Sequence, residues 1–451
     1  MSALFGTDGI RATVGCYPVT PESFLQLGWA LGSWIGSGKV LIGKDTRLSG
    51  YMLESALEAG LAAAGIDVYL TGPLPTPAIA YLTQSLNAQA GLVISASHNP
   101  FYDNGLKIFS SDGLKLTTEQ QNNITSFFQK KITVATSYEL GKAHRLNDAA
   151  GRYIEFLKSH FSSLDLSGIS IILDCAHGAA YQIAPELFKE LRANVQVIND
   201  QPNGYNINKN AGVMDLDLLE KVVHEQKPKF AFAFDGDADR LVAYVNGKKI
   251  NPNHILLVLY DYYQLRGMSK TGIAMTCLTN LGVQDYCSTQ GIAHVSTDVG
   301  DRNLIYACLQ YDWTIAGEPS GHYLLMDKLK TADALLTALA LVDYFIRTEK
   351  TAEYFEKKAP LYPSLIHNFH INDPKTVLSK NHITESLEKI KKNNPSERVI
   401  IRASGTEPVI RIYAEGKNLS TVEEIIKEAI AIFEKYKEDT TGIVDEKVLA
   451  H

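Results

Sequence analysis

Ser97 stands in a segment, residues 95–100 (SASHNP), that could carry nucleophilic chemistry. The apolar run at residues 91–94 (GLVI) directly precedes it, which places the serine at the carboxyl end of an expected strand. A serine hydroxyl can accept a phosphoryl group if a base removes its proton and a cation neutralises the charge. His98 adjoins the serine, and Lys107 is close enough in sequence to fold back over it. The alternative is a Ser/Asn/Pro turn without chemistry.

Three aspartates stand at alternate positions directly after the apolar run FAFAF: Asp235, Asp237 and Asp239. Carboxylates with this spacing can converge on one hard cation, and oxygen ligands of this kind suit Mg²⁺. A calcium-binding EF-hand does not fit, because Arg240 stands where that loop needs glycine and Asn246 where it needs glutamate. The alternative is a solvated acidic turn, which rarely follows a fully apolar strand so abruptly.

A third segment, residues 317–322 (GEPSGH), combines an acid, a hydroxyl and two glycines. Glu318 and Ser320 could exchange hydrogen bonds with neighbouring sugar hydroxyls, and the glycines let the backbone approach a ligand closely. An ordinary turn is the alternative.

A fourth segment, residues 402–408 (RASGTEP), has the composition of a phosphate cradle. Arginine contacts phosphate in a bidentate manner that lysine does not, and backbone N–H groups beside a glycine add donors. An ordinary β-turn is again the alternative. The candidate phosphate-binding residues are Arg402, Ser404, Gly405, Thr406 and Arg411.

Short apolar runs alternate with amphipathic stretches around these segments, which predicts parallel α/β units. Thr20 as N-cap and Pro21 at the first helical position predict a helix that ends near Ile35. Further strands are expected at 39–43, 67–70, 91–94, 169–173, 194–198, 230–234, 272–276 and 293–295, and helices at 53–64, 181–191, after 281 and at 333–346.

Residues 349–363 are charged and then proline-bearing, which predicts a linker into a last domain. In that domain we expect strands at 365–371, 398–401 and 409–414 and helices at 374–392 and 420–437.

We therefore expect an α/β protein made of three tandem related α/β domains with mixed sheets and a smaller C-terminal α+β domain. Folds of this kind bind ligands outside the carboxyl ends of their strands. The four segments would then meet in one cleft shared by four domains. The expected domains, which carry the serine, aspartate, sugar and phosphate segments in turn, are 1–153, 154–253, 254–363 and 364–451.

The composition is that of a globular protein, with 45% hydrophobic and 21% charged residues and a net charge of −7. The sequence contains no apolar run of about 18 residues, so no membrane span is predicted. It also contains no long basic run of the kind that binds nucleic acids. The five cysteines include no CxxC pair, which speaks against a zinc ribbon. The N-terminal stretch lacks the apolar core of a signal peptide, so we expect a cytoplasmic protein.

The four segments, in this order, resemble those of the α-D-phosphohexomutase superfamily. The stretches FGTDGIR (5–11), VGDR (299–302) and RASGTEPVIRIYAEG (402–416) add to the resemblance, which spans nearly the whole chain. It implies an isomerase that moves a phosphoryl group between O6 and O1 of a hexose, through a phosphoserine and a sugar 1,6-bisphosphate, with Mg²⁺ bound.

The resemblance also implies roles for single residues. Ser97 would carry the phosphoryl group and bind Mg²⁺ with the three aspartates, while Lys107 would act as acid and base, assisted by His98. Two arginines would stabilise negative charge in the active centre. The third segment would bind the sugar hydroxyls, and the fourth would bind the phosphate that does not react. The residues are Arg11 and Arg240; Glu318, Ser320 and His322; and Arg402, Ser404, Gly405, Thr406 and Arg411.

The sugar is less clearly indicated than the chemistry. The stretches quoted favour a hexosamine phosphate, and a mutase for mannose or glucose phosphate is the alternative. Ala12, Ala211 and Ala332 depart from residues usual in the family, outside the four segments. A Mg²⁺-dependent sugar phosphatase and a silent sugar-phosphate sensor are more distant alternatives. We expect neither nucleic-acid nor membrane partners, and either a monomer or a homodimer.

Overall fold

The computed structural model describes residues 4–6, 9–268, 272–404 and 408–448. The chain divides into two compact units. The first comprises Met1–Leu278 and Ile292–Phe355, and the second Thr279–Gly291 and Glu356–His451. Among the described residues, no helix has both the length and the apolar character that crossing a membrane requires.

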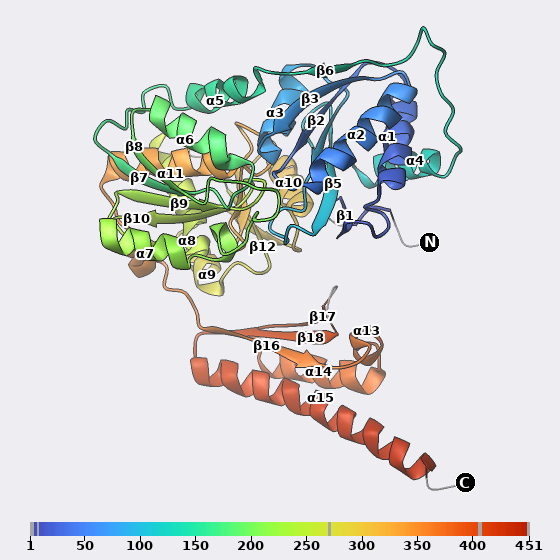
Figure 1. The fold of residues 1–451 in the computed structure, drawn as a ribbon. Coiled ribbons are helices and arrows are strands. Elements are labelled where there is room, and N and C mark those ends of the chain that lie inside the picture. Colours follow the sequence, from blue (N-terminus) through green and yellow to red (C-terminus); the bar gives the residue numbers. More distant parts are fainter. Residues whose placement is uncertain (1–3, 7–8, 269–271, 405–407, 449–451) are drawn as a thin grey trace. The chain divides into compact units, whose positions relative to one another are not determined.

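The N-terminal sheet of the first unit, drawn mainly in blue in Figure 1, is mixed. Its strand order is β1-β5-β4-β2-β3-β6. Strands β2, β3, β4 and β6 run parallel, whereas β5 lies antiparallel to both β4 and β1. The strands are β1 (Ile10–Thr13), β2 (Lys39–Lys44), β3 (Asp67–Pro73), β4 (Ala90–Ile94), β5 (Asp103–Ser110) and β6 (Ala143–Arg145). The helices are α1 (Pro21–Ile35), α2 (Ser49–Ala63), α3 (Thr76–Ser85), α4 (Thr118–Phe128) and α5 (Ala149–Ser159).

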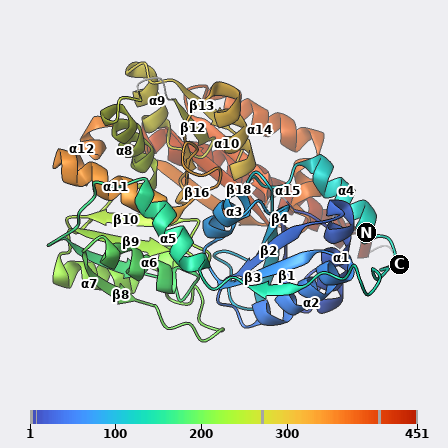
Figure 2. The same cartoon turned by 90° about the horizontal axis from the view of Figure 1, so that it is seen from above.

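Helices α1 and α2 lie next to each other beside this sheet (Figure 2). They pack closely because glycines lie where the two helices meet. A Cβ atom on Gly60 would overlap the carbonyl oxygen of Leu25, and one on Gly28 would overlap that of Leu57. The small residues therefore set the distance between the two helices.

We expect Gly60→Ala to lower the free energy of unfolding by about 2 kcal/mol, because a rigid backbone oxygen has to move. Gly151, in α5, serves as the control, because a Cβ atom added there would meet no atom within 4 Å apart from its chain neighbours and the backbone of its own helix. Gly151→Ala should stabilise by about 0.5–1 kcal/mol through helix propensity alone. Thermal melting of the two variants would measure this difference. Equal melting temperatures for Gly60→Ala and Gly151→Ala would contradict the close packing of α1 against α2.

The second sheet of the first unit is also mixed, with the order β11-β10-β9-β7-β8. Strands β7, β8 and β9 are parallel, and β10 lies antiparallel to β9 and β11. The strands are β7 (Ser170–Asp174), β8 (Asn194–Ile198), β9 (Phe230–Phe234), β10 (Leu241–Val245) and β11 (Lys248–Lys249). The helices are α6 (Ala180–Glu190), the short 3₁₀ helix η1 (Gly212–Met214) and α7 (Asp217–Gln226).

The third sheet has the order β13-β12-β14-β15, with only β15 antiparallel to its neighbour. The strands are β12 (Ile273–Thr276), β13 (His294–Thr297), β14 (Ile315–Glu318) and β15 (His322–Leu325). The helices are α8 (Pro252–Leu265), α10 (Asp301–Tyr311), α11 (Ala334–Thr348) and α12 (Ala352–Lys358). The expected mixed α/β sheets are therefore confirmed.

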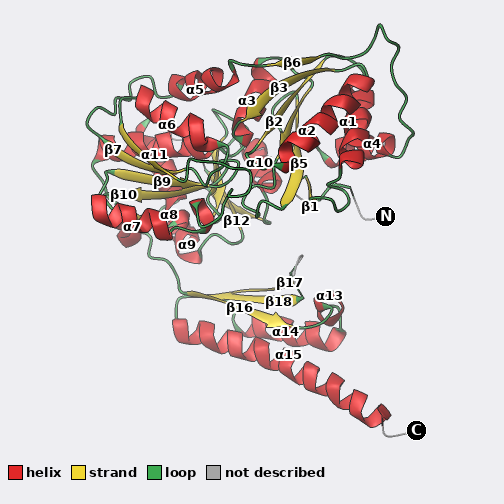
Figure 3. Cartoon of the chain, in the orientation of Figure 1, coloured by secondary structure: helices red, strands yellow, loops and turns green. Residues whose placement is uncertain are grey.

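The second unit contains an antiparallel sheet, β16-β18-β17, with α14 and α15 along one face (Figure 3). Helix α9 belongs to this unit, because Asn280 at its N-cap exchanges hydrogen bonds of 3.0 and 2.9 Å with the backbone of Tyr362. The elements are α9 (Leu281–Thr289), β16 (Ser364–His370), α13 (Pro374–Leu378), α14 (Asn381–Asn393), β17 (Arg398–Ala403), β18 (Val409–Glu415) and α15 (Leu419–Val448).

The observed local structure differs from the expected one in three places. The predicted linker at 349–363 does contain the division between the two units, which falls after Phe355, but it also includes helix α12, where Ala352 and Phe355 are buried. The single helix predicted at 374–392 is two helices, because Lys380 adopts an extended conformation between them. Helix α2 also begins at Ser49, four residues earlier than expected at residue 53.

Candidate active site

Ser97 lies in the loop that follows β4, as the sequence predicts, and its side chain is buried. Its Oγ donates a 2.7 Å hydrogen bond to Oδ2 of Asp235, which follows β9 in the second sheet. The backbone of Ser97 has φ of +52°, in the left-handed region. That conformation costs a residue with a side chain about 1–2 kcal/mol, so surrounding contacts must hold the serine there.

The three predicted aspartates converge. Ligand oxygens of Asp235, Asp237 and Asp239 lie within 4.8 Å of one another, and all three residues are buried. Burial, together with the charges of the other two aspartates, raises the pKa of Asp235 well above its usual range. Oδ1 of Asp237 is buried and has no hydrogen-bond partner among the described residues. A buried carboxylate oxygen of the cluster is therefore left without a donor or cation among the described residues.

Lys107 contacts two of these aspartates. It lies on β5, opposite Val93 of β4, so the antiparallel pairing brings it back to the end of β4 where the serine loop begins. Its Nζ donates 2.7 Å hydrogen bonds to Oδ2 of Asp237 and Oδ2 of Asp239. Burial alone would raise the pKa of Asp239, but Lys107 and other cations hold it well below its usual range.

His98 adjoins the serine, Arg11 contacts the serine loop, and the backbone N of Arg240 donates a 3.2 Å hydrogen bond to Oδ1 of Asp235. His98 Nδ1 lies 3.4 Å from Ser97 Oγ. Burial first, and then the charges of Arg240 and Arg11, lower the pKa of His98 to about 4, so its ring is neutral near pH 7. Arg11, on β1, donates a 3.1 Å hydrogen bond to Oδ1 of Asn99 in the serine loop. The structure thus brings together the residues predicted near the serine.

The third segment forms a hairpin between β14 and β15. Ser320 donates a 2.7 Å hydrogen bond to Oε1 of Glu318. His322 is buried between two acids, with Nδ1 3.7 Å from Asp239 Oδ1 and Nε2 3.6 Å from Asp301 Oδ2. Burial opposes a charged imidazole, but these acids raise the pKa of His322 to about 10. His322 therefore belongs to the charged cluster.

The fourth segment lies in the second unit, at the ends of β17 and β18. Arg402 on β17 pairs in register with Arg411 on β18. Ser404 N donates a 2.9 Å hydrogen bond to Val409 O. The predicted phosphate ligands Gly405 and Thr406 lie outside the described residues.

Sequence reasoning missed several buried polar residues that hold these loops. Asp45 and Arg47 follow β2, and Ser95 Oγ donates to Asp45 Oδ2 at 2.6 Å. Polar residues directly after a buried strand were the signal that located the serine and the aspartates, and the same signal was present after β2. Lys115 forms a 2.5 Å ion pair with Asp301, a residue of the VGDR stretch to which we assigned no role.

Asp333 supports the aspartate loop from the side of α11. It caps that helix, and the next residue, Ala334, donates its backbone N–H to Ala238 O at 3.2 Å. Burial raises the pKa of Asp333 to about 6, from 3.8. Because this pKa is raised on folding, the carboxyl stabilises the fold below about pH 4 and loses that contribution as the pH rises to about 6. The loss amounts to roughly 3 kcal/mol.

We expect Asp333→Asn to remove this pH dependence while keeping a helix cap. Melting of the wild type and the variant would be compared at about pH 4 and pH 7, since other groups titrate equally in both. The wild type should lose stability relative to the variant as the pH rises. If the difference in stability between the wild type and the variant is the same at both pH values, the raised pKa of Asp333 is contradicted.

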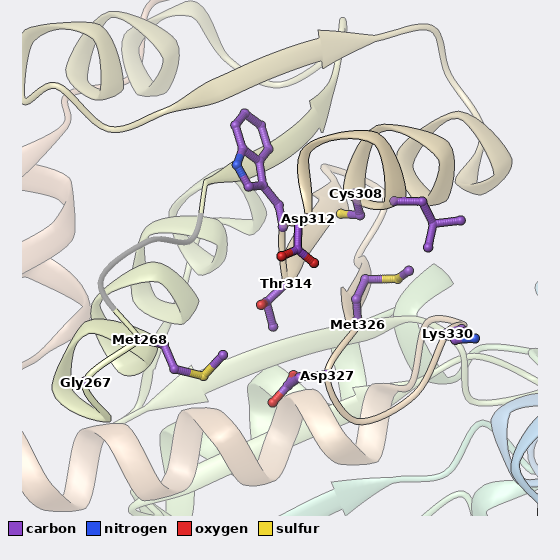
Figure 4. Close-up of a pocket in the computed structure, with 10 residues that line it drawn as sticks. Gly267, Met268, Cys308, Asp312, Thr314, Met326, Asp327 and Lys330 are labelled. Carbon is purple, nitrogen blue, oxygen red and sulfur yellow. The ribbon is translucent and has the colours of Figure 1, made fainter.

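A separate cavity of about 620 Å³ opens beside the third sheet (Figure 4). Its lining includes Met268, Trp313 and Asp327, and none of the predicted site residues is among those that line it. Asp327 is already paired with Lys328 at 2.7 Å. Cavity size therefore does not locate the candidate site, in which buried side chains from several loops contact one another.

Comparison with known proteins places this arrangement in a family. Models described as phosphoglucomutase/phosphomannomutase alpha/beta/alpha domains I, II and III match residues 2–134, 151–248 and 251–361, and the C-terminal domain model matches 368–432. The chain is 46% identical over 425 residues to phosphoglucosamine mutase of Vibrio campbellii, covering 93% of this chain and 95% of the relative. It is 44% identical over 440 residues to that of Aliivibrio salmonicida, covering 96% and 98%.

Solved structures have the same fold. A phosphoglucomutase/phosphomannomutase family protein from Burkholderia thailandensis matches with a TM-score of 0.80 at 21% identity, covering 96% of this chain and 98% of that one. An N-acetylphosphoglucosamine mutase from Aspergillus fumigatus, solved with GlcNAc-6P and magnesium, matches with a TM-score of 0.66 at 16% identity, covering 95% of each chain.

The chain therefore belongs to the phosphoglucomutase/phosphomannomutase family of four-domain α/β proteins, and it is an isomerase of the mutase type. Its relatives at 44–46% identity over nearly the full length are phosphoglucosamine mutases. That level of similarity supports this group over the phosphomannomutases and phosphoglucomutases.

Proposed function

We propose that this chain interconverts glucosamine 6-phosphate and glucosamine 1-phosphate, with Ser97 as the residue that carries the phosphoryl group. The observation that supports this most is the buried hydrogen bond of 2.7 Å between Ser97 Oγ and Asp235, inside the aspartate cluster. A serine held against a cation-binding cluster is the arrangement that a phosphoserine needs, because the cluster and its cation can accommodate the phosphoryl charge.

The aspartate cluster fits a magnesium ion. Three carboxylates converge, and the buried Oδ1 of Asp237 has no partner among the residues that the structure describes, so a hard cation could bind there. Asp235, Asp237 and Asp239 would hold the ion, with an oxygen of phosphorylated Ser97 as a further ligand. When bound, Mg²⁺ would neutralise charge on the phosphoryl group. The magnesium named with the Aspergillus enzyme is in line with this assignment.

The reaction would proceed in two transfers. A free hydroxyl of the sugar monophosphate attacks the phosphorus on Ser97, the bond from phosphorus to Ser97 Oγ breaks, and a sugar 1,6-bisphosphate forms. The bisphosphate then turns end for end. Ser97 Oγ attacks the other phosphate, which restores the phosphoserine and releases the isomeric monophosphate. A sugar bisphosphate would also activate an unphosphorylated enzyme, and an Aspergillus mutase variant was solved with glucose 1,6-bisphosphate.

Lys107 and His98 would handle the protons. The Lys107 ammonium, held by Asp237 and Asp239, lies beside the aspartate cluster that adjoins Ser97 and can give or take a proton there. The neutral ring of His98 faces Ser97 Oγ at 3.4 Å and can accept a hydrogen bond or a proton from it. We assign Lys107 as the acid and base and His98 as its assistant.

The remaining predicted residues would bind the substrate. Positive charge close to the serine would hold the reacting phosphate, the β14–β15 hairpin would bind the sugar hydroxyls, and the fourth segment would bind the other phosphate. The assigned residues are Arg11 and Arg240; Glu318, Ser320 and His322; and Arg402, Ser404, Gly405, Thr406 and Arg411.

We retain the domain limits 1–153, 154–253, 254–363 and 364–451 as a proposal, and the nearby ranges of the family models support them. The proposed partner is a hexosamine phosphate, and the complex of the Aspergillus enzyme with GlcNAc-6P supports this. We further propose a cytoplasmic monomer or homodimer without nucleic-acid or membrane partners.

A coupled mutase assay tests the proposed function. The enzyme, with Mg²⁺ and a trace of sugar bisphosphate, is given glucosamine 6-phosphate, glucose 1-phosphate or mannose 1-phosphate, and kcat/KM is compared. Preference for the glucosamine substrate supports the proposal. Preference for glucose or mannose phosphate keeps the mechanism and changes the substrate, whereas release of inorganic phosphate without isomerisation would indicate a phosphatase.

A further inference from the structure

Arg47 is the largest fully buried side chain of the first unit, and it binds the backbone of the serine loop. Its guanidinium donates hydrogen bonds to carbonyl oxygens along that loop, and each bond joins it to a residue far away in sequence. The acceptors are Ser97 O at 3.0 Å, Asn99 O at 2.8 Å, Asp103 O at 3.1 Å and Pro100 O. One side chain therefore bonds to the loop on both sides of its turn.

Asp45 and Ser95 complete this arrangement. Asp45 accepts 2.9 Å hydrogen bonds from the Nε and the backbone N of Arg47, which fixes the plane of the guanidinium. Ser95 donates to Asp45 at 2.6 Å and accepts from the backbone N of Ser97 at 2.9 Å. Asp45, Arg47 and Ser95, together called the Arg47 clamp here, thus contact both the N–H and the C=O of Ser97.

The second sheet supports the same peptide. Asn208 Nδ2 donates to Ser97 O at 2.8 Å, and a Cβ atom on Gly236 would lie only 2.6 Å from that oxygen. The backbone of Ser97 is left-handed, which residues with side chains rarely adopt. Contacts on every polar atom of this residue therefore hold a conformation that the chain alone does not favour.

We propose that Arg47, together with Asp45 and Ser95, is a positioning residue of the mutase reaction. The Arg47 clamp holds the backbone of Ser97 in the left-handed conformation that directs Oγ toward the aspartate cluster. This inference rests on the proposed function, in which Ser97 carries the phosphoryl group. Lysine could not replace Arg47, because a single ammonium cannot reach the several carbonyls that a planar guanidinium spans.

The test compares Arg47→Lys, Ser95→Ala and the double variant with the wild type. Each protein is first phosphorylated with a sugar bisphosphate, and the single-turnover transfer from Ser97 to saturating glucosamine 6-phosphate is then timed. We expect Arg47→Lys to slow transfer about 100-fold, because a phosphoserine misplaced by about 1 Å relative to the attacking sugar hydroxyl loses about this much. Ser95→Ala should slow it about 10-fold, because it removes fewer of the contacts that hold the loop. KM should change less than about 3-fold, since neither residue lies among the proposed substrate ligands.

Two features separate positioning from mere stability. The double variant should be slowed by less than the product of the single effects, because both changes release the same backbone. Ile66→Ala, in the core of the same sheet, should lower the melting temperature but leave the transfer rate unchanged.

Transfer at the wild-type rate in Arg47→Lys, with only a lower melting temperature, would overturn the proposal. If Arg47→Lys does not fold, Ser95→Ala decides the question by the same criterion. A wild-type enzyme that transfers no phosphoryl group from Ser97 to any hexose phosphate would overturn the proposed function, and the positioning role with it.

Discussion

Ser97→Ala is expected to lower mutase turnover by about 10⁴-fold or more, because the variant lacks the oxygen that carries the phosphoryl group. Ser97 Oγ is buried and bonded to Asp235, and no other hydroxyl contacts that carboxylate among the described side-chain hydrogen bonds. The coupled assay with glucosamine 6-phosphate measures the loss.

Ser110→Ala is the matched control for this result. Ser110 lies on β5, in the same sheet, and its hydroxyl donates hydrogen bonds within its own turn, to Asp112 and Leu114. We expect its turnover to match the wild type within about 2-fold, as for surface changes that touch no reacting group. Ser97→Ala with a tenth of wild-type turnover would contradict the covalent mechanism.

Asp237→Asn is expected to lower kcat by about 10³-fold, with more Mg²⁺ needed for half-maximal activity. The carboxylate accepts hydrogen bonds from Lys107 at 2.7 Å and from the Thr76 hydroxyl, and its second oxygen is buried without a partner among the described residues. An amide of the same size removes the charge that holds both the lysine and the cation.

Titration of activity with Mg²⁺ distinguishes this role from a general effect of charge. Asp217→Asn, at the start of α7, removes one negative charge from the same part of the chain and should change neither kcat nor the Mg²⁺ requirement. An Asp237→Asn enzyme with the wild-type requirement for Mg²⁺ would exclude Asp237 as a ligand.

The strands that carry the chemistry could be predicted because they are buried on both faces and so read as continuous apolar runs. The runs GLVI and FAFAF appear as β4 and β9, and the loops after them hold Ser97 and the aspartates. Thr20 and Pro21 likewise begin α1 as predicted, since the capping signal is local. A site residue could therefore be placed from the sequence alone where its position depends only on one apolar strand and the loop that follows it.

Elements without a local signal could not be predicted. Strand β5 begins with Asp103 and Asn104, which read as a turn, yet Asn104 is buried and donates to Ser49 at 2.8 Å. The contact of Lys107 with Asp237 and Asp239 depends on the antiparallel register of this strand, which no periodicity reveals.

Buried charges depend on partners that are distant in sequence. Arg47 bonds to residues about fifty positions away, and His322 lies between Asp239 and Asp301. A charged residue usually indicates a solvated surface. Only the fold shows that these side chains are enclosed and paired.

Phosphoryl labelling of Ser97 tests the central claim most directly. The enzyme is incubated with a sugar 1,6-bisphosphate that carries radioactive phosphate, and the labelled peptide is identified after digestion. Our account predicts label on the peptide that contains Ser97, and its transfer to sugar when glucosamine 6-phosphate is added. Label on another residue, or label that leaves Ser97 only as inorganic phosphate, would contradict it.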